Sequence, residues 1–559
     1  MSRNNPKNPS SDPMLIEEFS EEIRSKFRLA LDKEDFIQSV RKQVADDQDL
    51  KPNKNIAGIV DTLTKKSRQM STQVRFHDVG TVQHIGNGVA TVSGLPNVSI
   101  DEIVTFPNGT EGMALNLERN HVDLIMLGSE HGIRGGDLVQ ATGNRLKIPV
   151  GAQFMGRIIN PLGNPLDDMA AIDASEYRLF SRIAPSVIMR KPVKQSLFTG
   201  TKAIDTLFPI GRGQRELILG DRQTGKTTLA IDAILAQKNT GVRCIYVAIG
   251  QKKSSTLAVI ETLRSYGVLP NTAIILSGPD DQPALRYLAP YTGMTLAEYF
   301  LDQGLDVLIV FDDLSKHANA YRELSLLLRR PPGREAYPGD IFYIHSKLLE
   351  RACKLSEENG GGSITALPVA TTQDGNISAY IPTNLISITD GQIFLDNDLF
   401  NQGQKPAIDI GQSVSRVGSS AQEPAMRDLV GNLKLELSQF EEVEHFTRFG
   451  TEVDRATRLQ IDKGKRILET LKQNPNKPFS FPMTIVILFA LNQGLIENIT
   501  ISEIQSYQEA LREYFWRKET KLLNDIDQEG KLTDEIITDL EQALITFNDF
   551  LTEKKGKDL

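Results

Sequence analysis

The segment Gly-Asp-Arg-Gln-Thr-Gly-Lys-Thr at 220–227 constrains the fold more than any other part of the chain. A strand-like run at 215–219 precedes it and a helical pattern follows it, which is the strand–loop–helix context of a phosphate-binding loop. Glycines in such a loop let backbone N–H groups converge on phosphate oxygens at the positive end of the helix. We expect the Lys226 ammonium to reach the β- and γ-phosphates and the Thr227 hydroxyl to coordinate Mg²⁺. The predicted phosphate site therefore consists of Gly220, Asp221, Arg222, Gln223, Thr224, Gly225, Lys226 and Thr227.

A second nucleotide-binding signal is the apolar run at 306–312, which reads Asp-Val-Leu-Ile-Val-Phe-Asp. An acid at the end of such a strand is commonly only a helix cap, so alone it is weak support for a metal ligand. Combined with an upstream phosphate loop, the run favours Asp312 as the carboxylate that holds a Mg²⁺-bound water. We expect the adjacent Asp313 to cap a helix or to pair structurally.

An amide stands where a hydrolytic site needs a base. Gln251 follows Gly220 by 31 residues and comes directly after the strand-like run at 245–250. Hydrolysis usually relies on a carboxylate that accepts a proton from water. An amide orients water in some NTPases, but it cannot accept that proton. The sequence therefore suggests a chain that binds a nucleotide without hydrolysing it, and a merely tolerated polar residue at this position is compatible with the same conclusion.

The pattern along the chain predicts several domains, as a length of 559 residues requires. A leader at 1–13 is expected to be disordered, and Leu15 to Phe27 carries an apolar stripe, so 1–73 is assigned as a leader with an amphipathic helical arm. Such a stripe fits an arm that docks on a partner, and it equally fits packing on the body of this protein. Short β-branched runs separated by turns predict a β-barrel at 74–165. Strands alternating with helices predict an α/β phosphate-loop domain at 166–422, and 423–559 has a helical pattern.

Composition narrows the possible partners and compartments. The net charge of −9 argues against a nucleic-acid partner, because neutralising phosphates needs a basic surface. The two cysteines, Cys244 and Cys353, are typical neither of a disulfide framework nor of a zinc site, and they fit a reducing compartment. No apolar run is long enough to span a bilayer, and the first residues have the pattern of neither a secretory signal nor a transit peptide.

Four motifs in order resemble one family. The phosphate loop, the run 310–316 (Val-Phe-Asp-Asp-Leu-Ser-Lys), the run 327–340 and the run 413–418 (Ser-Val-Ser-Arg-Val-Gly) together resemble the α subunits of rotary F-type ATP synthases. The resemblance extends from about residue 74 to the C-terminus. It implies a multidomain fold with an N-terminal β-barrel, a central RecA-like α/β phosphate-loop domain and a C-terminal α-helical domain. Mg²⁺ with ATP or ADP is the implied ligand.

The same resemblance implies a set of partners. Three such chains would alternate with three β subunits around a γ stalk, and the N-terminal arm would contact the peripheral stalk or its δ subunit. The membrane sector would be reached only indirectly, and the complex would couple ATP synthesis or hydrolysis to proton or sodium flow. The implied location is peripheral, at the cytoplasmic face of a bacterial inner membrane or, alternatively, at an organelle inner membrane.

The resemblance also assigns roles to single residues. Arg416 would be an arginine finger that reaches the γ-phosphate in a neighbouring β subunit. The family's β subunits carry Glu where this chain has Gln251, which implies an α site that does not turn over. The further contacts implied are Arg222 and Gln223 beside the phosphates and metal, and Phe400 and Gln473 beside the base.

Two positions depart from the family's pattern near the base. Lys405 stands where the family often has Arg, and Pro475 stands where it often has a second Gln. Lys cannot stack as a planar guanidinium does, and Pro has no side-chain hydrogen bond to offer. These departures put adenine selectivity in doubt. The coupled ion and the net direction of the reaction are not readable from this chain.

Two other functions fit the nucleotide motifs. One is a self-sufficient homohexameric ATPase, such as an export motor or a helicase-like ring, although such a ring needs its own base. The other is a nucleotide-sensing assembly protein that never joins a membrane motor. Hydrolysis by the purified chain would favour the first, and absence of a β-type partner would favour the second.

Overall fold

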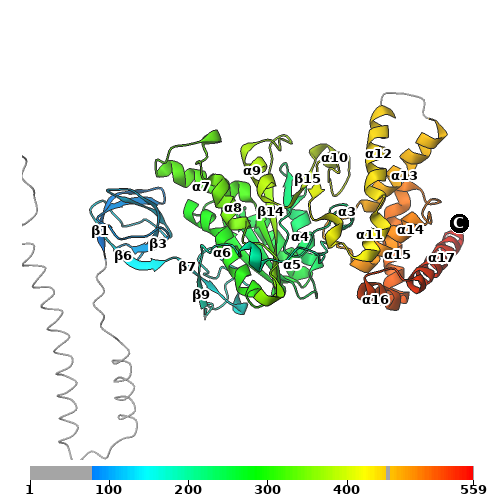
Figure 1. Ribbon diagram of the computed structural model, residues 1–559, viewed down its shortest axis with the longest axis horizontal. Helices are drawn as coiled ribbons and strands as arrows, with labels where there is room; N and C mark the ends of the chain where they lie inside the picture. Colours follow the sequence, from blue (N-terminus) through cyan, green and yellow to red (C-terminus); the bar gives the residue numbers. More distant parts are fainter. Residues whose placement is uncertain (1–77, 175, 448–453, 558–559) are drawn as a thin grey trace, which may run out of the picture. The chain divides into compact units, whose positions relative to one another are not determined.

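The computed structural model describes residues 78–174, 176–447 and 454–557. The chain divides into two compact units, Met1–Phe76 and His77–Leu559, and all described residues belong to the second. The predicted leader and amphipathic arm at 1–73 lie outside the described residues. The second unit has the three predicted parts: a β-barrel, a nucleotide-binding α/β domain and a helical C-terminal domain (Figure 1).

The barrel is closed by six antiparallel strands in the order β1-β2-β5-β4-β3-β6. Its strands are β1 (Val79–Gly86), β2 (Val89–Ser93), β3 (Glu102–Thr105), β4 (Glu111–Leu117), β5 (Val122–Met126) and β6 (Leu138–Arg145). Asn87 and Gly88 form the two-residue turn between β1 and β2, with φ of 56° and 79°. Both angles are positive, which this hairpin turn requires and which Asn-Gly supplies at low cost. The turn signal and the alternation of apolar residues together explain why the barrel was predictable.

The segment after the barrel joins it to the central domain. It contains β7 (Lys147–Val150), β8 (Ile158–Ile159) and β9 (Glu176–Leu179); β7 pairs with β9, whereas β8 pairs in parallel with β12 of the central sheet. The sequence pattern set the end of the barrel domain at 165, but the hydrogen bonds end the barrel at Arg145 and place β8 in the central sheet. A buried strand of two residues has no periodicity by which to assign it.

The central domain is built on an eight-stranded sheet with the order β16-β15-β10-β14-β13-β11-β12-β8. The strands are β10 (Leu217–Gly220), β11 (Arg243–Ile249), β12 (Thr272–Ser277), β13 (Asp306–Asp312), β14 (Ser363–Thr371), β15 (Gly391–Leu395) and β16 (Val414–Ser415). Neighbouring strands are parallel, except that β16 runs antiparallel to β15. The carboxyl ends of the parallel strands therefore share one edge, where α/β sheets bind their ligands.

Helices cover both faces of this sheet (Figure 1). The helices of the central domain are α3 (Lys202–Leu207), α4 (Lys226–Ala236), α5 (Lys253–Ser265), α6 (Pro283–Leu301), α7 (Leu314–Leu327), α8 (Ile341–Leu349), α9 (Tyr380–Ile388) and α10 (Asn397–Asn401). Successive strand residues point into different cores: Tyr246 packs in the core that contains α4 and α5 residues, and Val247 packs with α6 and α7. Burial on both faces explains why these strands read as continuous apolar runs.

The C-terminal domain is helical, as predicted. Its helices are α11 (Pro424–Val430), α12 (Leu433–Thr447), α13 (Arg455–Leu471), α14 (Phe481–Asn492), α15 (Ile504–Lys518), α16 (Thr520–Glu529) and α17 (Asp534–Lys557). From Phe481 to Ala490 every residue of α14 is buried, so this apolar helix is the centre of the domain. Within the described part of the chain, no helix combines the length and apolarity that crossing a membrane demands.

Candidate nucleotide-binding site

The predicted phosphate loop connects the end of β10 to the start of α4. Gly220 ends the strand, and a Cβ at this position would lie 2.6 Å from the Leu395 carbonyl oxygen, so no larger side chain fits. Gly225 has φ 100° and directly precedes α4, whose first turn has unpaired N–H groups at the positive end of the helix dipole. The loop thus has the backbone form that binds a phosphate chain.

Lys226 lies inside this loop rather than in solvent. Its ammonium donates to the carbonyl oxygens of Gly220, at 2.8 Å, and of Asp221. Burial lowers the pKa of Lys226, and the nearby charges of Asp313 and Asp312 act in the opposite direction. A buried ammonium held at the loop's centre is placed to bind an anionic group there.

The other loop side chains differ in where they lie. Asp221 accepts hydrogen bonds from the Thr372 hydroxyl at 2.6 Å and from the Gly375 N–H at 3.0 Å, so it fastens the loop to the β14–α9 connection. Gln223 lines the pocket, whereas Arg222 is exposed and lies outside the pocket lining. The positive charge of Arg222 makes a small contribution to lowering the pKa of Lys226.

Thr227 and Asp312 meet at the predicted metal position. The Thr227 hydroxyl donates to Asp312 Oδ2 at 2.8 Å, and the Tyr246 hydroxyl donates to the same oxygen at 2.7 Å. Burial raises the pKa of Asp312, as does the charge of Asp313. A hydroxyl next to a buried carboxylate at the end of the phosphate loop is a donor set that fits Mg²⁺ and its bound water. Asp313 caps α7 by accepting from the Lys316 N–H at 2.9 Å, as the sequence predicted.

Both ends of the Gln251 amide are occupied. Its Nε2 donates to Asp312 Oδ1 at 2.8 Å, and its Oε1 accepts from the Lys316 ammonium at 2.7 Å. A carboxylate in this place would set a negative oxygen against Asp312, whereas the amide matches an acceptor on one side and a donor on the other. The residue is therefore a fitted link between β13 and α7.

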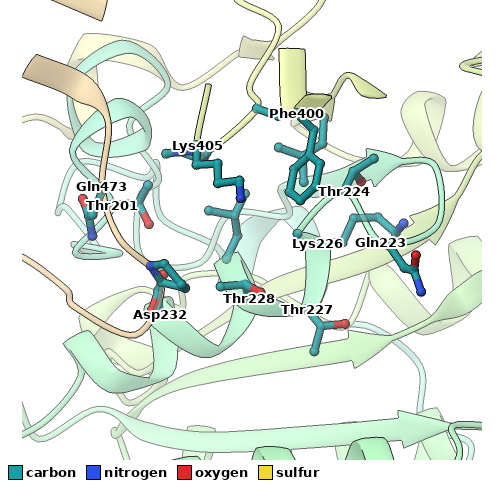
Figure 2. Close-up of a pocket in the computed structure, with 16 residues that line it drawn as sticks. Thr201, Gln223, Thr224, Lys226, Thr227, Thr228, Asp232, Phe400, Lys405 and Gln473 are labelled. Carbon is teal, nitrogen blue, oxygen red and sulfur yellow. The ribbon is translucent and has the colours of Figure 1, made fainter. Parts of the chain in front are cut away.

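A pocket of about 360 Å³ extends from the phosphate loop to the junction with the C-terminal domain (Figure 2). It brings Phe400 and Gln473 to the same cavity as the loop. Lys405 Nζ lies 4.8 Å from the centre of the Phe400 ring, in a cation–π contact. The residues that line the pocket beyond the loop and the first turn of α4 are Thr201, Asp232, Leu395, Phe400, Lys405, Pro406, Ala407, Gln473 and Pro475.

Gln473 reaches the pocket with its amide already paired. Its Oε1 accepts from the Lys202 N–H at 3.1 Å, and its Nε2 donates to the carbonyl oxygens of Gly200 at 2.8 Å and Lys477 at 3.0 Å. These bonds tie the start of α3 to the segment after α13. Gln473, which we predicted to lie beside the nucleotide base, therefore connects the central and C-terminal domains. Its amide oxygen and nitrogen both bond to backbone groups of this chain.

Four further residues of the site were not predicted. Tyr246 looks like core in an apolar strand, and Lys316 belongs to the run 310–316 but looks there like a surface lysine in a helix. Thr201 is 1% exposed and lines the pocket, and its hydroxyl has no partner among the described residues. Asp232 also lines the pocket, and burial raises its pKa to about 7. The Asn476 N–H donates a hydrogen bond to this carboxylate and acts in the opposite direction. Only the packing of distant segments reveals these four.

Arg416 lies at the opposite edge of the sheet from this pocket. It follows β16, and its N–H donates to the Asp390 carbonyl at 2.9 Å, just before β15 begins. Leu395 pairs with Gly220 of the phosphate loop, and Asp390 lies five residues earlier along the same strand direction. At about 3.3 Å per residue, these five residues span about 16 Å. The side chain is exposed and makes no hydrogen bond or ion pair with a described residue. Arg416 is thus separated from its own subunit's phosphate loop and free to meet another surface.

Comparisons with known proteins agree across the three domains. Three domain models of the ATP synthase alpha/beta family match this chain: the β-barrel domain at residues 76–143, the nucleotide-binding domain at 200–415 and the C-terminal domain at 422–547. An ATP synthase subunit alpha of Aquifex aeolicus (strain VF5) is 49% identical over 488 residues, which are 87% of this chain and 97% of the relative. The subunit alpha of Clostridium botulinum (strain Alaska E43 / Type E3) is 50% identical over 489 residues, 88% of this chain and 97% of the relative. That of Lacticaseibacillus casei (strain BL23) is 52% identical over 476 residues, 85% and 94% of the two chains.

Proposed function

The chain belongs to the ATP synthase alpha/beta family, among its alpha subunits. We propose that it is a regulatory nucleotide-binding subunit that does not turn over ATP itself. The observation that carries this proposal is the Gln251 amide, which is bound between Asp312 and Lys316. A site with a phosphate loop and a metal position but no proton acceptor would bind its nucleotide without hydrolysing it.

Mg²⁺ with ATP or ADP is the proposed ligand. Thr227 and Asp312 would hold the metal, whose charge offsets that of the β- and γ-phosphate oxygens. Lys226 and the N–H groups at the start of α4 would bind the phosphates. Phe400 would support the base with its ring, which lines the same pocket (Figure 2).

Arg416 is the proposed contribution of this chain to catalysis. Its place at the far edge of the sheet supports action in a neighbouring subunit, because about 16 Å of strand separates it from its own loop. In a ring of three such chains and three β subunits, its guanidinium would neutralise charge on the transferring phosphoryl group. The complex would couple ATP synthesis or hydrolysis to proton or sodium flow.

The remaining partners follow from the same assignment. A γ subunit would occupy the centre of the ring, and the arm at 1–73, outside the described residues, would contact the peripheral stalk or δ subunit. The membrane sector would be joined through those stalks. The proposed location is the cytoplasmic face of a bacterial inner membrane, with an organelle inner membrane as the alternative. A self-sufficient hexameric ATPase is disfavoured by the amide at Gln251.

Copurification tests the assignment. We expect the tagged full chain, isolated from its native cells in mild detergent, to bring down a β-type subunit in a one-to-one ratio together with stalk and membrane-sector subunits. Mass spectrometry with quantified peptides gives the ratio. A homohexamer without a β-type partner would contradict the proposal, and so would a complex that lacks every membrane-sector subunit.

The part of the pocket that would hold the nucleotide base predicts weak discrimination between ATP and GTP. The Gln473 amide is paired within the chain, Pro475 offers no hydrogen bond, and the Phe400 ring accepts any flat base. A site discriminates strongly only where it hydrogen-bonds the distinguishing group. We expect Mg-GTP to bind the isolated chain within about tenfold of Mg-ATP. Competition with a fluorescent ATP measures this, and a preference for ATP of a thousandfold would contradict it.

A further inference from the structure

A buried carboxyl group lies beneath the turn that carries Arg416. Glu216 precedes β10 and its side chain is completely buried. One oxygen, Oε2, accepts from the Gln214 amide at 2.7 Å, whereas Oε1 has no hydrogen-bond partner among the described residues. Leaving a buried carboxyl oxygen unpaired is costly, so the position calls for an explanation beyond packing.

A chain of hydrogen bonds leads from this carboxyl group to Arg416. The Gln214 Nε2 that donates to Glu216 also lies 3.2 Å from the hydroxyl of Ser415, the residue before Arg416. That hydroxyl donates to the Pro209 carbonyl at 2.7 Å and accepts from the Gly418 N–H at 3.2 Å. Ser415 therefore fixes both sides of the turn, and Gln214 connects it to the buried acid.

Strand pairing places the carboxyl group directly beside this turn. Ser415 pairs with Gly391 across the β15–β16 ladder. A Cβ on Gly391 would overlap both carboxyl oxygens of Glu216, so the acid fills the space that the glycine leaves. Burial raises the pKa of Glu216 well above its usual range, and the charge of Arg416 opposes that rise. The two side chains therefore interact electrostatically although no hydrogen bond joins them.

The starting point of the Arg416 side chain depends on this support. The guanidinium has no hydrogen-bond partner of its own in the described part of the chain, so the backbone at 415–418 is what sets the position from which it reaches out. A finger that must reach a phosphoryl group needs a defined geometry, and an error of 1 Å in position can cost about 100-fold in rate. A turn fixed by partly buried hydrogen bonds contributes to that geometry.

We propose that Glu216, acting through Gln214 and Ser415, is a positioning residue that aims the Arg416 guanidinium at the neighbouring subunit. This inference rests on the proposed role of Arg416. It assigns Glu216 no contact with the nucleotide or with the reacting atoms. A purely structural acid would affect stability and assembly, whereas a positioning acid affects the rate of the assembled ring.

The test compares two replacements of Glu216 in the reconstituted ring of this chain with its β-type partner. Glu216→Leu keeps an apolar body of similar length but removes the acceptor for Gln214. We expect kcat for ATP hydrolysis to fall about 10- to 100-fold, with KM and nucleotide binding by this chain unchanged. Glu216→Gln keeps an acceptor oxygen, so kcat is expected to stay within about twofold of the wild type.

Two further variants keep the inference falsifiable. Asp205→Leu removes another buried carboxyl, which accepts from the Thr199 N–H and hydroxyl, and it should lower stability without changing kcat per assembled ring. If Glu216→Leu rings do not assemble, Ser415→Ala takes its place. It breaks the link to Gln214, together with the bonds to Pro209 and Gly418, at a half-buried site and should lower kcat alone.

A normal kcat in the Glu216→Leu ring, or in the Ser415→Ala ring used in its place, would overturn the inference. Failure of Glu216→Gln to keep kcat would overturn it too, as would an equal loss of kcat in Asp205→Leu. An inactive Arg416→Ala ring beside a fully active Glu216→Leu ring would refute only the positioning role. An active Arg416→Ala ring would refute the proposed function itself.

Discussion

Replacing Arg416 with alanine is expected to lower steady-state ATP hydrolysis by the reconstituted ring about 10³- to 10⁵-fold, the effect of an arginine finger in other NTPases. The reason is the charge that develops on the transferring phosphoryl group, which a guanidinium neutralises from the adjacent subunit. Arg416 is exposed and has no ion-pair partner among the described residues, so its removal breaks no ion pair within them. A coupled assay of phosphate release measures the loss.

The controls separate chemistry from folding. Arg416→Ala should assemble normally and bind Mg-nucleotide at its own pocket with unchanged affinity, because the pocket lies at the other edge of the sheet. Arg416→Lys should recover little activity, since an ammonium lacks the bidentate fork of a guanidinium. Arg517→Ala removes an exposed arginine from an i,i+4 pair on α15 and should leave turnover unchanged. Normal turnover by the Arg416→Ala ring would contradict the assignment.

Replacing Lys226 with methionine is expected to weaken binding of Mg-ATP to the isolated chain by roughly 10- to 100-fold. Hydrogen bonds to charged groups contribute about 1.5–3 kcal/mol each, and the buried Lys226 ammonium is centred in the loop that would hold the phosphates. Methionine preserves the length of the side chain and its apolar contacts. Calorimetric titration with Mg-ATP gives the affinity of both proteins.

Lys238→Met is the matched control for this experiment. Lys238 follows α4 and donates to the Tyr266 carbonyl at 2.7 Å on the exposed side of the domain, outside the nucleotide pocket. Its replacement should leave the affinity for Mg-ATP unchanged. Equal losses in the two variants would show that charge removal alone, and not the phosphate loop, causes the effect.

The parts of the fold that the sequence predicted are those with a local physical signature. The phosphate loop needs glycines at fixed positions, the barrel has an Asn-Gly turn with positive φ, and the strands buried on both faces read as apolar runs. The three-part architecture is confirmed for the described residues. The end of the barrel domain was less readable, because β8 is a strand of two residues whose partner β12 lies more than 100 residues later.

The site was predictable where a motif carries it and not where distant segments meet. The hydroxyl of Tyr246 and the ammonium of Lys316 reach the metal position and Gln251 only through the packing of β11 and α7. Gln473 was expected beside the base, yet its amide is used to join α3 to the C-terminal domain. Which hydrogen bonds a side chain makes depends on its neighbours in space, and periodicity contains no information on these.

The fate of ATP bound to the purified chain tests the central claim most directly. The chain is mixed with Mg-ATP below its own concentration, and the nucleotide is recovered after several hours and separated by chromatography. A site with the Gln251 amide in place of a base should return the ATP intact, and the Lys226→Met variant should hold less of it. Steady conversion of the bound ATP to ADP and phosphate, abolished by Lys226→Met, would contradict the account.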